Sequence, residues 1–140
     1  MIYNFDDKVF EVFPAKTISG AGSVTGSVNT LGYGATQFIL DVSNSSTPAT
    51  AHYGIYSSND NFTWVLVPGS NYTLGASADG IAVWNISAQG GTYNQYLCLS
   101  GSQASGTATV CAVATCSEGI GVNTLDTTTI ASPYLGFFQI

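Results

Sequence analysis

Apolar and polar residues alternate along much of the chain with the two-residue period that predicts β-strands. The alternation is clearest in one late segment, where Leu97 and Leu99 share one face of the predicted strand while Tyr96 and Cys98 point the other way. Residues 38–40 are apolar at consecutive positions. Such strands are expected to be covered on both faces, by another layer of the same domain or by another subunit.

Strand patterns bounded by Gly, Ser, Asn and Asp recur throughout the chain, whereas no long stretch free of glycine keeps a helical apolar spacing. The sequence therefore predicts an all-β fold, a β-sandwich or jelly roll of about eight strands. The predicted strands cover residues 8–13, 23–29, 35–43, 50–57, 63–67, 80–87, 92–100, 107–115 and 134–140.

The length of 140 residues fits one domain, and the hydrophobic content of 45% excludes a disordered chain. Residues 1–16 differ from the rest because they hold both lysines and three of the eight acidic residues. We therefore expect a short N-terminal arm, residues 1–16, followed by a β-sandwich domain, residues 17–140. The N-terminus carries acids where a signal peptide needs basic residues, which predicts a soluble protein that is not exported.

The charge pattern excludes two classes of partner. Lys8 and Lys16 are the only basic side chains, and the formal net charge is −6. Nucleic acids are bound largely through lysine and arginine contacts to phosphates, and anionic membranes attract basic segments in the same way. We expect this protein to bind neither nucleic acid nor a membrane.

Catalytic patterns are missing. His52 is the only histidine, and the acids of residues 17–140 are scattered singly, whereas acid–base catalysis needs paired or partnered groups. Residues 59–61 (Asn-Asp-Asn) are interpreted as a turn, because the further acids of a calcium loop do not follow. We expect no enzymatic activity, no cofactor and no metal.

The three cysteines match no zinc-binding spacing. Each lies in an apolar, strand-like run, which predicts buried free thiols. A cross-strand bond between Cys98 and Cys111 is the alternative, and a reducing site of synthesis argues against it.

Aromatic side chains leave two interpretations open. In the first, the aromatic side chains line a sugar-binding face, since aromatic rings stack on the apolar faces of sugars. In the second, they fill the core and the subunit interfaces. The candidates for a sugar-binding face are Trp64, Trp84, Tyr53, Tyr56, Phe62 and Tyr93.

Three phrases, taken in order, resemble the head decoration (capsid cement) proteins of tailed bacteriophages. Residues 27–34 read SVNTLGYG before an apolar strand, similar to the Val-Asp-Thr-Leu-Gly-Tyr phrase of that family. Residues 56–64 read YSSNDNFTW, similar to its Ser-Asp-Asp-Gly-Ser-Thr-Trp hairpin, with Asn61 in the place of the glycine that adopts positive φ. Tyr96-Leu97 stands where relatives carry Arg-Tyr-Leu-Arg, so Gln95 and Cys98 replace two arginines. The likeness covers roughly residues 20–115.

The resemblance implies a virion structural protein that binds the outer surface of the capsid, commonly as a homotrimer, after synthesis in the host cytoplasm. Its partner would be the major capsid protein, whose neighbouring subunits it would clamp together. Within the chain, the arm is the candidate contact, because it holds the only cations that would pair with acids on a partner. The capsid-contact residues predicted on this basis are Lys8, Phe10, Phe13 and Lys16. The alternative function is a carbohydrate-binding or adhesin-like β-module of the virion.

Overall fold

The computed structural model describes residues 8–30, 33, 35–43, 51–74, 79–87, 96–117 and 134–139. These residues form ten β-strands, and no helix among them could cross a membrane. The strands are β1 (Lys8–Ser19), β2 (Gly22–Asn29), β3 (Ala35–Ser43), β4 (Ala51–Ser58), β5 (Val65–Leu66), β6 (Tyr72–Leu74), β7 (Gly80–Ser87), β8 (Tyr96–Gln103), β9 (Thr107–Ser117) and β10 (Tyr134–Gln139).

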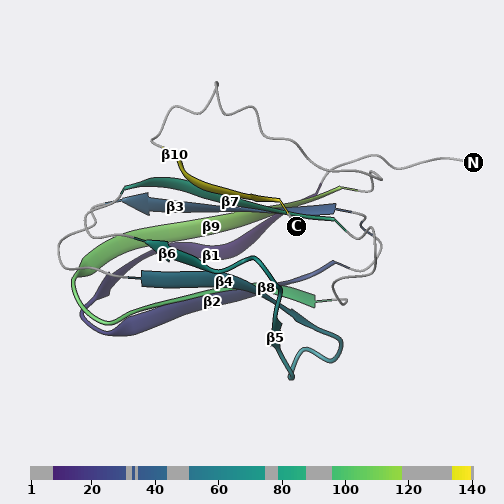
Figure 1. Ribbon diagram of the computed structural model, residues 1–140, viewed down its shortest axis with the longest axis horizontal. Helices are drawn as coiled ribbons and strands as arrows, with labels where there is room; N and C mark the ends of the chain where they lie inside the picture. The colour runs from purple at the N-terminus through teal and green to yellow at the C-terminus, as the bar shows by residue number, and fades with distance from the viewer. Residues whose placement is uncertain are drawn as a thin grey trace, which may run out of the picture.

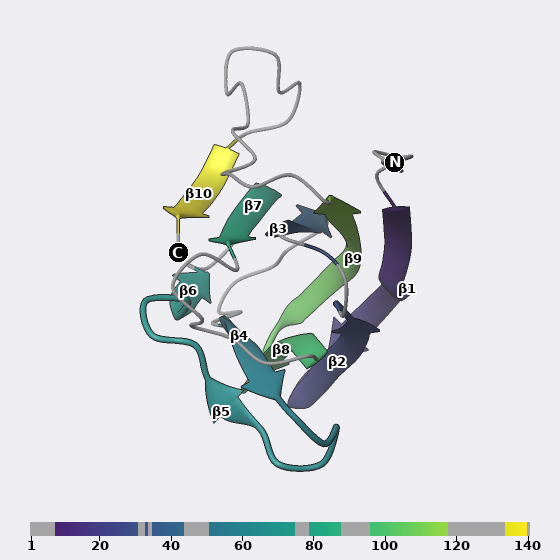
Figure 2. The same cartoon turned by 90° about the vertical axis from the view of Figure 1, so that its right-hand side faces the viewer.

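Two sheets pack face to face. Sheet A has the strand order β1-β9-β3-β7-β10, and sheet B has the order β2-β8-β4-β5, with β6 also paired to β4. Figures 1 and 2 show the two layers, with sheet A above sheet B in Figure 1. From β1 to β4 the chain passes alternately between the sheets; β8 then enters between β2 and β4, and β9 between β1 and β3. This order is that of a jelly roll, so the predicted fold class is confirmed.

Each of the nine predicted strands overlaps a strand of the structure. The pattern missed β6, because its three residues are too few for a period to be recognised. It also ended the first strand at residue 13, directly before Pro14, because proline lacks the N–H that a strand ladder uses. In the structure β1 continues to Ser19, and its pairing with β9 shifts register around Pro14. An edge strand tolerates proline at such an irregularity, because the missing N–H faces no partner strand.

The expected boundary between arm and sandwich, at residue 16, lies inside β1. The lysines and acids of this segment set its composition apart, yet Lys8 is aligned with Cys116 and Lys16 with Val110 in one antiparallel ladder with β9. Residues 8–16 are therefore part of the sandwich. Residues 1–7 of the predicted arm lie outside the described residues.

The core lies between the inner faces of the two sheets. Sheet A contributes Phe38, Leu40 and Trp84, and sheet B contributes Ile55 and Leu99, none of which exposes any surface. Every second residue of β3 and β9 points into this layer, as the alternation predicts. Such close-packed apolar layers supply most of the stability of a sandwich.

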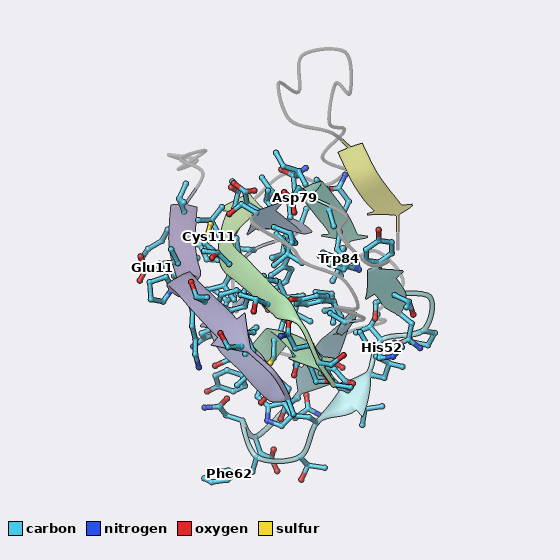
Figure 3. The ribbon with its side chains drawn as sticks, turned by 90° about the vertical axis from the view of Figure 1, so that its left-hand side faces the viewer. Glu11, His52, Phe62, Asp79, Trp84 and Cys111 are labelled. Carbon is cyan, nitrogen blue, oxygen red and sulfur yellow. The ribbon has the colours of Figure 1, made fainter. Side chains whose placement is uncertain are left out.

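A buried polar contact joins the two layers. The indole N–H of Trp84, on β7 of sheet A, donates to the carbonyl of Ser70 at 2.8 Å. The hydroxyl of Ser70 accepts the N–H of Ile55, on β4 of sheet B, at 3.1 Å, and donates to the carbonyl of Val67 at 2.7 Å. The backbone N–H of Val67 in turn donates to the carbonyl of Ile55 at 2.8 Å. The segment between β5 and β6 is thus bound to both sheets. Figure 3 shows Trp84 between the layers.

A second polar contact closes one end of the sandwich. The side-chain amide of Gln103, at the end of β8, lies within hydrogen-bonding distance of the carbonyls of Ile18, Gly20 and Gly106, at 2.9–3.1 Å. It therefore joins the β1–β2 turn to the β8–β9 turn. Gly20 adopts a positive φ of 72° there, as expected of a glycine in a tight turn.

The cysteines are free thiols, as predicted. The alternative bond between Cys98 and Cys111 is excluded, because Cys98 lies on β8 of sheet B and Cys111 on β9 of sheet A. Cys98 and Cys116 are buried.

The contact between Trp84 and Ser70 predicts a specific loss of stability. Trp84→Phe removes the indole donor and leaves a buried carbonyl and a void, so we expect the free energy of unfolding to fall by about 2–4 kcal/mol. Urea unfolding followed by far-UV circular dichroism measures it. The matched control is Trp64→Phe, at a half-buried position, which should cost less than about 1 kcal/mol. Equal losses in the two variants would contradict the anchoring role of Trp84.

Candidate functional site

The β4–β5 hairpin is held by one carboxylate. Asp60 Oδ1 accepts the backbone N–H groups of Phe62 and Thr63 at 2.9 and 2.8 Å, and the hydroxyl of Ser58 donates to the same oxygen at 2.9 Å. Ser58 Oγ also accepts the N–H of Asn61 at 2.9 Å. The backbone bonds from Thr63 and Phe62, together with the Ser58 hydroxyl, lower the pKa of Asp60 to about 2, because each favours the ionised form.

This turn sets where the hairpin side chains point. Asn61 has a φ of 63°, as the resemblance implied for the position that carries glycine in the similar hairpin. Phe62 lies at the tip, 88% exposed, and Figure 3 shows it directed away from the body. Trp64 is half-buried and lines a groove over the outer face of sheet B.

The groove is formed by one register row of sheet B and the hairpin above it. Ser27, Cys98 and Tyr56 lie opposite one another on β2, β8 and β4, so their side chains share the outer face. Trp64 and Asn61 reach over this row from the hairpin. The enclosed space has a volume of about 550 Å³, within the range of small-molecule sites.

Thr25 and Ser100, in the next register row, complete the groove. The hydroxyl of Thr25 and the thiol of Cys98 are hydrogen-bonded at 2.9 Å. Burial raises the pKa of the Cys98 thiol, and the bond to Thr25 offsets only part of this effect, so the thiol is uncharged near neutral pH. The position at which the resemblance implies arginine therefore contributes a neutral group to the groove.

A smaller hollow of about 90 Å³ adjoins the groove. It shares Tyr56 and Ser100 with the groove, and its other lining residues are His52, Tyr53, Gly54, Asn71, Gly101 and Ser102. His52 is exposed, and its Nδ1 lies 3.0 Å from the hydroxyl of Thr73. No group of three or more histidine, cysteine or acidic side chains that could hold a metal occurs in the part of the chain that the structure describes.

The structure separates the aromatic candidates. Trp64 and Tyr56 line the groove, whereas Trp84 is fully buried in the core and Tyr53 is 3% exposed. Trp84 therefore cannot be part of a sugar-binding face, and burial raises the pKa of Tyr53 to about 12. Phe62 is exposed but lies outside the groove. Tyr93, and Gln95 beside it, lie outside the described residues.

The outer face of sheet A has a different chemistry. Val9 on β1 is 65% exposed, Val113 on β9 is 38% exposed, and Ile39 on β3 is half-buried beside Val113. Glu11 is aligned with Val113 and Asp41 follows Ile39 on the same face, so acids flank the apolar residues. Figure 3 shows Glu11 on the outer side of β1. We call Val9, Val113 and Ile39 the apolar patch.

The four predicted capsid-contact residues do not form one surface. Lys8 and Lys16 are exposed, whereas Phe13 is 7% exposed and belongs to the core. Phe10 is half-buried: its ring packs edge-on against Tyr33, with centroids 6.4 Å apart, and the Lys8 amine lies 5.3 Å from its centroid.

Val9 and Val113 were missed as surface residues. The signal was in the alternation, since Val9 has the opposite phase to Phe10 and must point away from the core. Nothing in the local sequence shows that Val113 lies near it, because the two residues occupy neighbouring register rows only through the pairing of β1 with β9, which are far apart in the sequence.

Comparisons with known proteins give likenesses to solved structures and none by sequence. No family model matches the chain, and no curated protein matches it. The solved structure of a pectin-binding carbohydrate-binding module is similar, with a TM-score of 0.43 and 14% sequence identity, over 90% of this chain and 80% of that one.

The turn at Asp60 predicts a pH dependence. Its folded pKa of about 2 is lower than the ordinary value of 3.8, so its contribution is complete above pH 3.8 and is lost as the pH falls through about 2. The amide resonances of Phe62 and Thr63, followed by NMR during acid titration, should shift with a midpoint near pH 2. Asp60→Asn is the control, because it keeps an oxygen acceptor and removes the titration. A midpoint near the ordinary aspartate value, or an unchanged shift in Asp60→Asn, would be inconsistent with this turn.

Proposed function

We propose that the protein is a structural protein of a tailed-bacteriophage virion, a decoration protein that binds the outer surface of the head. The three phrases at residues 27–34, 56–64 and 96–97 support this proposal through their order and spacing. The protein would act by binding the major capsid protein and holding neighbouring subunits together, commonly as a homotrimer. Binding to the assembled shell stabilises it by mass action, so neither turnover nor a cofactor is needed.

The observation that carries the proposal is the apolar patch on the outer face of sheet A. Val9 and Val113 are two of the large hydrophobic residues exposed in the described part of the chain, and they lie on adjacent strands. Exposed apolar residues grouped within a polar rim are typical of protein interfaces. Glu11 and Asp41 supply an acidic rim here, which favours a partner surface with an apolar centre and basic edges.

The patch changes the predicted contact within β1. Lys8, Phe10, Phe13 and Lys16 were predicted to contact the capsid, the lysines by pairing with its acids. Phe13 is in the core, however, and the Phe10 ring packs against Tyr33 and lies beneath the Lys8 amine. The contact we now propose consists of Val9, Val113 and Ile39. Neither lysine is part of it, because the Lys8 amine lies over the Phe10 ring and Lys16 is aligned with the buried Val110. Apolar burial at the centre of an interface contributes more affinity than charges at its edge.

A second candidate function, carbohydrate binding, is favoured by one specific observation. Trp64 and Tyr56 line the same groove as the hydroxyls of Thr25, Ser27 and Ser100. An aromatic wall beside hydroxyl groups suits a sugar ring, which has an apolar face and a hydrogen-bonding edge. The two functions do not compete, because the groove is on sheet B and the apolar patch on sheet A.

Val9→Asp tests the decoration proposal. The side chain is 65% exposed, so the fold should tolerate the substitution, while a buried contact with the capsid should not. We expect the affinity for capsids assembled without this protein to fall roughly tenfold or more, measured by co-sedimentation.

Ser23→Asp is the matched control, because it adds the same charge at an exposed position on the outer face of sheet B. It should bind capsids like the unmodified chain. Equal losses in the two variants would indicate a charge effect and not a contact at the apolar patch. If the unmodified chain fails to bind capsids, the decoration proposal is wrong.

A further inference from the structure

The groove under Trp64 combines an aromatic surface with hydrogen-bonding groups, the two features that bind a sugar. Trp64 and Tyr56 present aromatic surface, while Thr25, Ser27 and Ser100 present hydroxyls at positions fixed by the β2–β8–β4 register. Hydroxyls both donate and accept hydrogen bonds, so they match the hydroxyls of a sugar in either direction.

Charge is missing from the same surface. No lysine, arginine, aspartate or glutamate is among the described residues that line the groove or the adjoining hollow. The Cys98 thiol on the floor is kept neutral by burial. A charged ligand would lose hydration without gaining an ion pair, and an anionic ligand would also meet the field of a chain with a net charge of −6. The lining thus favours an uncharged ligand over an acidic one.

The shape favours more than one sugar unit. The groove and the hollow share Tyr56 and Ser100, so they form one surface that crosses β8 and β4 from Trp64 toward His52. Glycine at position 54 keeps the hollow open, because a side chain there would point toward Leu66 and Asn71. An extended oligosaccharide would place one ring against Trp64 and the next over Gly54.

The surface is also rigid, which lowers the entropic cost of binding. Its floor is a strand register without a bulge between β2 and β8 or between β8 and β4. Its upper wall is the turn held by Asp60 and Ser58.

We infer that this surface binds a neutral oligosaccharide of at least two units, with Trp64 stacked on the apolar face of one ring and Ser100 hydrogen-bonded between the two positions. The inference rests on carbohydrate binding, the second candidate function, and names the ligand class that the site takes. On a virion, such a site would face the surface glycans of a cell.

The test has two stages. The unmodified chain is first applied to an array that carries neutral gluco-, galacto- and manno-oligosaccharides and uronic acid oligosaccharides of the same lengths. The tightest neutral ligand is then titrated calorimetrically into the unmodified chain and three variants. Trp64→Ala should lower the affinity roughly tenfold or more, Trp64→Phe should lower it less, and Phe62→Ala should change it less than about twofold.

Phe62→Ala is the matched control, because Phe62 is an aromatic residue of the same hairpin and lies outside the groove. Trp64→Phe keeps the test decisive if Trp64→Ala does not fold. Quenching of Trp64 fluorescence by the ligand gives a further direct readout, since Trp84 is buried and should not respond.

The outcomes separate the inference from the function on which it rests. Binding to neutral oligosaccharides that depends on Trp64 supports both. Binding to uronic acid oligosaccharides alone would show that the inferred neutral ligand class is wrong, while carbohydrate binding as the function would still be supported. Binding that Phe62→Ala weakens as much as Trp64→Ala would overturn the groove as its location. If no glycan on the array binds, carbohydrate binding itself is wrong.

Discussion

The hydrogen bond from the Trp84 indole to the carbonyl of Ser70 is the constraint on which the arrangement of the two sheets depends. Burial of apolar side chains is not directional, so it does not by itself specify which polar groups meet across the core. The Trp84–Ser70–Ile55 contact is directional, and it fixes β7 of sheet A against β4 of sheet B inside the core. The same contact holds the chain just after β5, and β5 pairs with β4 at Tyr56. The position of the hairpin that carries Trp64, and hence the shape of the groove, follows from it.

The two outer faces of the sandwich differ in chemistry because the sequence places different residues at the outward positions of their strands. Strands of a sandwich must place apolar residues inward, which leaves every second position free to vary. On sheet A these positions include Val9, Val113 and Ile39 within an acidic rim, whereas on sheet B they include Thr25, Ser27 and Ser100 beneath Trp64. We propose a protein partner for the first face and a hydroxyl-rich ligand for the second. A decoration protein that binds the shell by sheet A would leave the groove of sheet B directed outward.

Local pattern predicted the strands and the buried free thiols, because each depends on residues close together in the sequence, and the resemblance supplied the positive φ of Asn61. The failures concern long-range pairing. The composition of residues 8–16 suggested an arm, yet their pairing with β9 makes them an edge strand. Trp64 and Trp84 could not be told apart, since each lies in or beside a strand and only the packing of two sheets buries one of them. For the same reason the groove, which combines β2, β4, β8 and a hairpin, could not be located beforehand.

The central proposal, that the protein binds a bacteriophage head through the outer face of sheet A, is tested most directly by electron cryomicroscopy of the proposed virions. We expect density for the sandwich on the outside of the shell, with β1, β9 and β3 toward the major capsid protein and the β4–β5 hairpin toward solvent. Density at the tail alone, or a sandwich bound to the shell through sheet B, would contradict it.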